Sequence, residues 1–77
     1  MPKVTIYSTQ ACHFCQEAKV FFKANNIPFT EHNVGLDQEK RKEMIDMTGQ
    51  MGVPVIKIDD QVLVGFYEPK LKEVLGL

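Results

Sequence analysis

The alternation of apolar and polar positions in the first half of the chain predicts a strand, a helix and a second strand. Residues 3–7 alternate and are rich in β-branched side chains, which is typical of a strand. Residues 12–25 carry apolar side chains at helical spacing, and a pair of asparagines followed by Pro28 ends that helix. Residues 29–34 predict a short second strand. The expected buried face of the helix consists of Cys15, Ala18, Phe21 and Phe22.

A charged helix is predicted next, over residues 38–48. Asp37 precedes it as the expected N-cap, because a short side-chain carboxylate accepts hydrogen bonds from the first backbone N–H groups of a helix. Gly49 follows it as the expected C-terminal stop, since glycine adopts the left-handed conformation that ends helices. Its expected buried stripe consists of Met44, Ile45, Met47 and Thr48.

The last third of the chain predicts a hairpin and a closing helix. Residues 53–58 form an apolar strand and residues 61–64 a return strand, joined by the turn Asp59-Asp60. Gly65 precedes a helix that has Pro69 near its start. The expected buried face of this helix consists of Leu71, Val74 and Leu75.

The order of elements, β-α-β-α-β-β-α, predicts an α/β fold in one domain over residues 1–77. The first β-α-β unit requires parallel strands with a right-handed crossover. Because the third strand is apolar nearly throughout, we expect helices on both faces of a four-stranded mixed sheet.

Composition and charge narrow the functional classes. The chain is 44% hydrophobic and 25% charged, as in an ordinary globular domain, and its formal net charge is -1. No basic excess is present to neutralise phosphates, so nucleic-acid binding is disfavoured. The sequence shows neither a secretory signal nor an apolar segment of bilayer-spanning length, which predicts a cytoplasmic protein without membrane attachment. A monomer is the default expectation.

The two cysteines carry the predicted chemistry. Cys12 and Cys15 are three residues apart and open the first helix of a β-α-β unit, a context that indicates redox chemistry. A helix N-terminus favours an anion, so Cys12 is the expected thiolate nucleophile. Cys15, one turn deeper, is the expected resolving thiol, more buried and less ionised. Between them, His13 either favours the thiolate or is an exposed loop residue without effect, and Phe14 is expected to shape an apolar lip around the sulfurs.

Three stretches resemble the glutaredoxin family, and the resemblance covers almost the whole chain. Tyr7-Ser8 leads to Cys12-His13-Phe14-Cys15, which is similar to the family's strand, loop and CPYC site. Residues 48–54 resemble its TGQRTVP segment, and Val64-Gly65-Phe66 stands where the family has a Gly-Gly pair. The resemblance implies a minimal thioredoxin fold and a thiol–disulfide oxidoreductase that reduces disulfide-containing proteins or glutathione mixed disulfides.

The resemblance also implies a substrate site around the sulfurs. It places a cis peptide bond at Val53-Pro54, with Pro54 beside the sulfurs and the backbone of Val53 free to pair with an extended substrate. It further implies that Gln50 and Glu68 contact glutathione, which serves as reductant and not as a bound cofactor. Lys40 or Arg41 would supply positive charge nearby, although a solvated helix face is the more ordinary interpretation.

Several positions depart from the family pattern. Thr9 stands where many members have a cation, and the CPYC proline is absent. The dipeptide Gly65-Phe66 is similar to glutaredoxin-like redoxins that bind glutathione poorly, receive electrons from thioredoxin reductase and donate them to ribonucleotide reductase. Both glutathione and thioredoxin reductase therefore remain open as electron sources.

Metal-binding roles are weaker alternatives. Some glutaredoxins share a [2Fe–2S] cluster between two subunits, in which case Cys12 would be the ligand. A zinc site needs paired Cys or His ligands, and His32 stands alone, as expected of a surface residue. Haem attachment fails because Gln16, not histidine, follows the second cysteine. No metal site is predicted.

Overall fold

The computed structural model describes residues 2–77 and contains the seven predicted elements in the predicted order. The elements are β1 (Val4–Ser8), α1 (His13–Ala24), β2 (Thr30–Asn33), α2 (Gln38–Thr48), β3 (Val55–Ile58), β4 (Gln61–Val64) and α3 (Glu68–Leu75).

The four strands form one mixed sheet in the order β2-β1-β3-β4. β1 runs parallel to β2, with Tyr7 opposite His32, and antiparallel to β3, with Tyr7 opposite Val55. β3 and β4 form the antiparallel hairpin, and Asp59 in its turn has a positive φ of 51°. The predicted α/β fold and four-stranded mixed sheet are confirmed.

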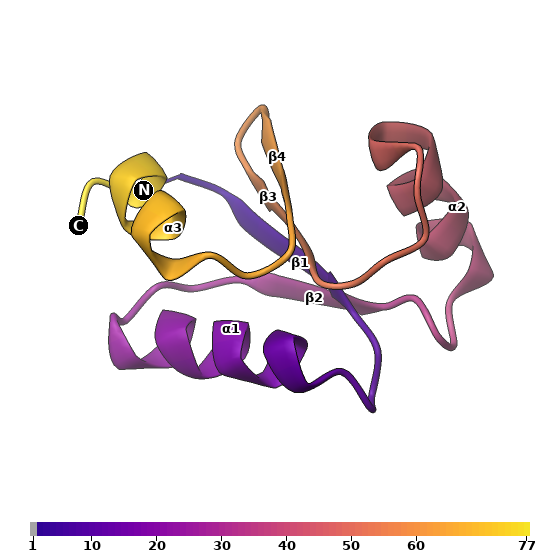
Figure 1. Cartoon of the computed structure of the whole chain (residues 1–77), viewed down its shortest axis with the longest axis horizontal. Helices are drawn as coiled ribbons and strands as arrows, with labels where there is room; N and C mark the ends of the chain where they lie inside the picture. The colour runs from indigo at the N-terminus through magenta and orange to yellow at the C-terminus, as the bar shows by residue number, and fades with distance from the viewer. Residues whose placement is uncertain (1) are drawn as a thin grey trace.

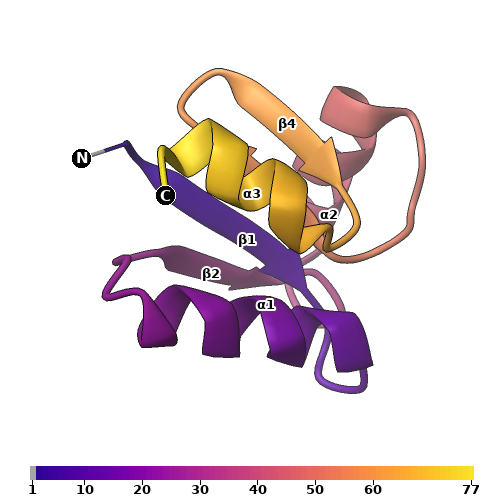
Figure 2. The same cartoon turned by 60° about the vertical axis from the view of Figure 1, so that its left-hand side comes forward.

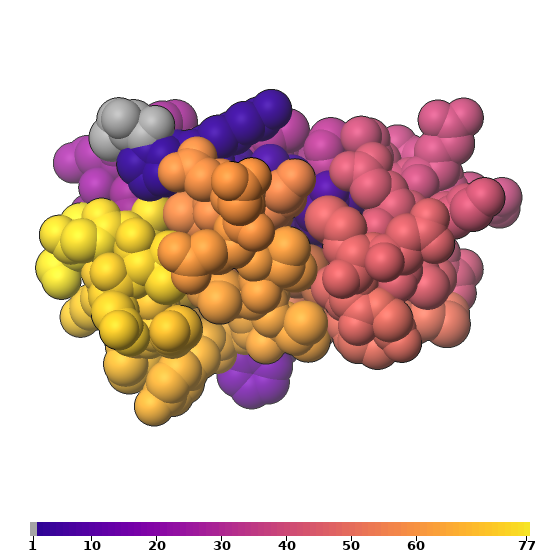
Figure 3. Space-filling view, turned by 90° about the horizontal axis from the view of Figure 1, so that it is seen from above, coloured from indigo at the N-terminus to yellow at the C-terminus, as the bar shows by residue number. Residues whose placement is uncertain are grey.

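The helices cover both faces of the sheet, as expected. α1 and α3 lie together on one face and α2 on the other (Figures 1 and 2). From above, the β3–β4 hairpin lies between α3 and α2 (Figure 3). Every residue of the central strand β1 is buried because neighbours cover it on both sides.

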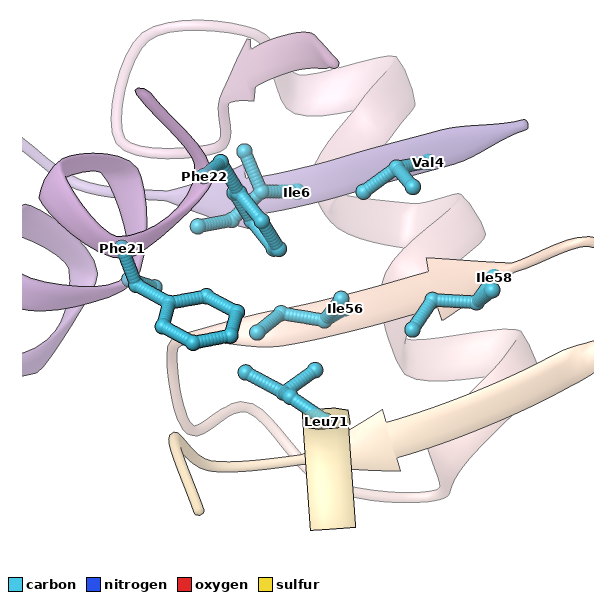
Figure 4. Close-up of a cluster of buried hydrophobic side chains, with 8 residues drawn as sticks. Val4, Ile6, Phe21, Phe22, Ile56, Ile58 and Leu71 are labelled. Atoms are coloured by element: carbon cyan, nitrogen blue, oxygen red, sulfur yellow. The ribbon is translucent and has the colours of Figure 1, made fainter. Parts of the chain in front are cut away.

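The larger apolar cluster fills the space between the sheet, α1 and α3 (Figure 4). Its buried members are Val4, Ile6, Ala18, Phe21, Phe22, Ile56, Ile58 and Leu71. The four residues predicted as the buried face of the first helix are all buried. In α3 only Leu71 is buried, whereas Val74 and Leu75 are half-buried at the edge of this cluster.

The charged helix begins and ends where its caps predict. The Asp37 carboxylate accepts a hydrogen bond from the Lys40 N–H at 3.1 Å, and Gly49 has φ 71°. Its buried stripe is narrower than expected, because only Met44 is fully buried. Ile45, Met47 and Thr48 are half-buried, since α2 packs over one end of the sheet with a smaller cluster.

Three boundaries differ from the sequence-based ones. α1 begins at His13, with Cys12 as its N-cap, and β2 is shorter than residues 29–34. β3 begins at Val55 instead of residue 53, since Pro54 has no backbone N–H to donate to the ladder. Within residues 2–77, none of the helices has the length and apolar character needed to cross a bilayer.

Candidate active site

Cys12 lies at the N-terminus of α1, directly after the loop that leaves β1. It is the N-cap residue, and its Sγ accepts a hydrogen bond from the backbone N–H of Cys15 at 3.1 Å. The described first turn of α1 contains no acidic residue, so no carboxylate opposes the positive end of the helix dipole. Once reduced, the Cys12 sulfur is therefore placed where a helix favours an anion.

The two cysteines differ in access to solvent. Their sulfurs are joined as a disulfide, and their Cα atoms are 5.2 Å apart. Cys15 has no exposed surface, whereas Cys12 is only half-buried. The expectation that Cys15 is the more buried thiol is confirmed. This arrangement allows an incoming disulfide to reach Cys12 and leaves Cys15 to attack from inside.

His13 and Phe14 lie exposed beside the cysteines. The His13 Nε2 is 3.1 Å from the Glu17 carboxylate, and the His13 side chain is 77% exposed. The Phe14 ring meets the His13 ring edge-on at 5.4 Å and is also mostly exposed. Phe14 thus presents apolar surface two residues after Cys12, and its role as a lip around the sulfurs stays a prediction.

The Val53-Pro54 peptide bond is cis, as the resemblance implies. Tyr7 pairs with Val55, so the next step of this antiparallel register brings Pro54 to the end of β1 from which the cysteine loop departs. The Pro54 carbonyl accepts a hydrogen bond from the Gly65 N–H at 2.7 Å. Within residues 2–77 the Val53 backbone has no backbone hydrogen-bond partner, which leaves it available to an extended substrate.

The side-chain amide of Gln50 forms hydrogen bonds within its own loop. Its amide nitrogen donates to the Gly52 carbonyl at 3.2 Å, and its amide oxygen accepts from the Gly52 N–H. The Thr48 hydroxyl also lies 3.4 Å from the amide nitrogen. Contact between Gln50 and a glutathione carboxylate stays a prediction, and it would require this amide to exchange loop partners.

The segment that leads into α3 contains predicted site residues in different surroundings. Gly65 has φ 88°, a conformation that side-chain-bearing residues rarely adopt. Phe66 follows, and its ring lies 6.0 Å from the Phe21 ring at the edge of the main cluster. Glu68 is exposed at the first turn of α3. Phe66 thus packs half-buried against the core, whereas Glu68 is exposed to solvent.

The two cations considered for the site have different surroundings. The Lys40 ammonium is 3.0 Å from the Glu43 carboxylate. Arg41 has its Nη2 at 4.0 Å from the sulfur of Met51, in the loop that precedes Val53. Of the two, Arg41 is the one that lies against the site loop.

A polar cluster behind the site was not found from the sequence. Ser8, buried at the end of β1, donates from its hydroxyl to Glu31 Oε2 at 2.8 Å, and Lys19 Nζ lies 2.8 Å from the same oxygen. The hydrogen bond from Lys19, followed by that from Ser8, lowers the pKa of Glu31 below its usual range. These contacts join β1, β2 and α1 where the cysteine loop begins. The three residues come from separate elements, so no sequence motif connects them.

The opposite face of β1 carries another unpredicted polar contact. The Tyr7 hydroxyl donates to Glu43 Oε1 at 2.7 Å. Burial first, and then the hydrogen bond to Glu43, raises the pKa of Tyr7 to about 12. His32 is half-buried beside Tyr7, with ring centroids 5.5 Å apart, instead of lying freely on the surface. Within residues 2–77, no three His, Cys, Asp or Glu side chains gather as a metal site.

Comparisons by family model, by sequence and by structure all find the same kind of protein. The family model described as Glutaredoxin matches residues 4–63. A glutaredoxin-like protein from the rubredoxin operon of Clostridium pasteurianum is 39% identical, over 94% of this chain and 96% of that protein. Glutaredoxin 3 of Escherichia coli is 35% identical, over 84% of this chain and 78% of its own. The crystal structure of a glutaredoxin from Archaeoglobus fulgidus superposes with a TM-score of 0.86 at 25% identity, over 97% and 87% of the two chains.

Proposed function

Because the chain belongs to the glutaredoxin family, we propose that it reduces disulfides of proteins and mixed disulfides of glutathione through Cys12 and Cys15. The observation that carries the proposal is the asymmetry of the pair. Cys12 is accessible at a helix N-terminus, and Cys15 is fully buried within disulfide reach of it. A nucleophile needs access and a lowered thiol pKa, and a resolving thiol needs only proximity.

The reaction proceeds in two exchanges. The Cys12 thiolate attacks one substrate sulfur, the substrate S–S bond breaks, and the departing thiolate takes a proton from solvent. Cys15, losing its proton, then attacks the Cys12 sulfur, which releases the second substrate thiol and forms the Cys12–Cys15 disulfide. Two electrons have passed from the dithiol to the substrate. The oxidised protein is reset by two glutathione thiols, which become glutathione disulfide.

Thioredoxin reductase is a second candidate for the electron source. Two observations favour it: the Gln50 amide is occupied by its own loop, and Phe66 packs half-buried at the edge of the main cluster, at the position of the family's second glycine. Both reduce the polar surface offered to glutathione. The Gly65-Phe66 dipeptide would then indicate a redoxin that serves ribonucleotide reductase.

The test is NADPH consumption with hydroxyethyl disulfide, with glutathione and glutathione reductase in one reaction and thioredoxin reductase in the other. Turnover with glutathione alone supports the first proposal. Turnover with thioredoxin reductase alone replaces it with the second. Absence of turnover in both reactions contradicts a reductase function. A cytoplasmic location and a monomeric state remain predictions, the latter testable by analytical ultracentrifugation.

A further inference from the structure

An apolar groove runs along α1 on the side that faces the start of α3. Its volume is about 430 Å³, and its lining includes Val20, Phe21 and Phe66. α1 and α3 lie on the same face of the sheet (Figure 2), and the contact between the Phe21 and Phe66 rings joins α1 to the segment that leads into α3. Val20 is 65% exposed, so together with the Phe21 and Phe66 rings it gives the groove an apolar lining that a partner can reach.

The groove is continuous with the reactive end of α1. Gln16, which also lines it, follows Cys12 by one helical turn, and the Gln16 N–H donates to the Cys12 carbonyl at 3.2 Å. Residues four apart lie on one side of a helix, so Cys12, Gln16 and Val20 follow each other along one face. At a rise of 1.5 Å per residue, Val20 lies about 12 Å from Cys12.

The charge of the groove is one-sided. Glu17 and Glu68 line it, and no Lys, Arg or His side chain does so within residues 2–77. His13 lies against Glu17 from outside the groove, whereas Glu68 makes no ion pair among the described residues. An occupant with a positive charge next to an apolar side chain therefore complements this lining better than an acidic one.

From these observations we infer that the groove binds the polypeptide segment next to the cysteine of a disulfide-bonded partner protein. The inference rests on the proposed function. A strand-like peptide advances about 3.3 Å per residue, so about four residues span the distance from Cys12 to Val20. The partner segment thus carries an apolar side chain about four residues from its reactive cysteine, with a lysine or arginine beside it. Small disulfides do not reach the groove.

The test compares synthetic peptides whose single cysteine is a mixed disulfide with mercaptoethanol. Two of the peptides carry a leucine followed by a lysine, one of them four residues before the cysteine and the other four residues after it. Matched peptides have serine in place of the leucine or glutamate in place of the lysine. The better leucine-lysine peptide is expected to have a KM about tenfold lower than its serine counterpart, which is about 1.4 kcal/mol. Equal KM values for all peptides would overturn the inference.

A pair of matched variants locates the effect. Val20→Lys is expected to raise the KM of the leucine-lysine peptide to that of the serine peptide, while turnover of hydroxyethyl disulfide is unchanged. Val62→Lys makes the same substitution at an exposed valine of β4, which does not line the groove, and is expected to leave both substrates unaffected. Equal effects of the two variants would contradict the groove. So would self-association that Val20→Lys abolishes, because a second copy would then be the occupant.

A binding measurement separates this inference from the proposed function. A fluorescein-labelled leucine-lysine peptide with serine in place of cysteine cannot exchange disulfides, and its anisotropy reports binding alone. Tighter binding to the unmodified protein than to Val20→Lys supports the groove even if no disulfide is reduced. Equal binding to both overturns the groove even if hydroxyethyl disulfide is reduced.

Discussion

The two faces of the sheet are built differently. The face under α1 and α3 holds eight buried residues in one apolar cluster, whereas the apolar cluster under α2 has four buried members among residues 2–77: Tyr7, Val34, Met44 and Val55. The second face is completed by polar contacts, of which the bond from Tyr7 to Glu43 is the shortest at 2.7 Å. The cysteines belong to the first face.

The reactive cysteines of this small domain thus lie on the face of the sheet that has the larger apolar cluster. A chain of 77 residues has few apolar side chains to distribute, and a precise site needs a rigid support. α1, which carries Cys12 at its end, is fixed by Ala18, Phe21 and Phe22. α2 contributes a loop to the site and is held by one fully buried residue, Met44, and by side-chain hydrogen bonds.

The largest expected effect concerns activity. Cys12→Ser is expected to reduce disulfide reductase activity to background, since a hydroxyl is not ionised at neutral pH. Cys15→Ser is expected to keep the first exchange and to accumulate mixed disulfides, detectable by mass spectrometry. Tyr7→Phe, on the α2 face, is the control and should retain turnover. Full activity of Cys12→Ser would contradict the assignment of the nucleophile.

The next effect compares the two apolar clusters. Phe22→Ala is expected to lower the free energy of unfolding by about 3–5 kcal/mol, and Met44→Ala by about 2–3 kcal/mol, because the second cavity opens in a smaller and more adaptable cluster. Urea denaturation followed by circular dichroism measures both. If Met44→Ala proves the more damaging substitution, the α2 face is the better packed one and the comparison is reversed.

A smaller effect is expected from the hydrogen bond that fastens α2. Tyr7→Phe removes the hydroxyl bonded to Glu43 and is expected to cost about 1 kcal/mol of unfolding free energy, since the freed carboxylate is accessible to water. Thermal melts of Tyr7→Phe, Glu43→Gln and the double variant give the coupling free energy between the two side chains. Strict additivity of the two single substitutions would show that the bond contributes nothing.

The smallest expected effect depends on pH. The pKa of Glu31 is lowered by Lys19 and then Ser8, so its ion pair stabilises the fold fully above the ordinary glutamate pKa of about 4.3. This contribution is lost as the pH falls through the lower folded-state pKa. Glu31→Gln should therefore flatten the decrease in melting temperature in that range. Glu73→Gln, at an exposed ion pair of 3.7 Å on α3, serves as control and should follow the unmodified protein.

The sequence predicted those features that depend on a few neighbouring residues. The caps Asp37 and Gly49, and the position of Cys12 at a helix start, depend on neighbouring residues only, and the structure has them. The cis bond before Pro54 came from the resemblance and not from physical reasoning, because most bonds before proline are trans.

Contacts between distant elements could not be predicted. The hydrogen bonds of Glu31 to Ser8 and Lys19 depend on the register of β2 against β1 and on the rotation of α1 above them. The inward turn of Gln50 depends on the path of its loop, and the packing of Phe66 on Phe21 depends on how α3 approaches α1. The sequence identifies these residues, but their contacts depend on how the elements are arranged in space.

The central claim is that the N-terminus of α1 makes Cys12, and not Cys15, the thiolate nucleophile. The most direct measurement is the rate of iodoacetamide alkylation of the reduced protein as a function of pH, with the modified cysteine identified by mass spectrometry. The account predicts that Cys12 reacts first, with an apparent pKa well below the free-cysteine value of about 8.5. Equal reactivity of both thiols with an apparent pKa near 8.5, or earlier alkylation of Cys15, would contradict it.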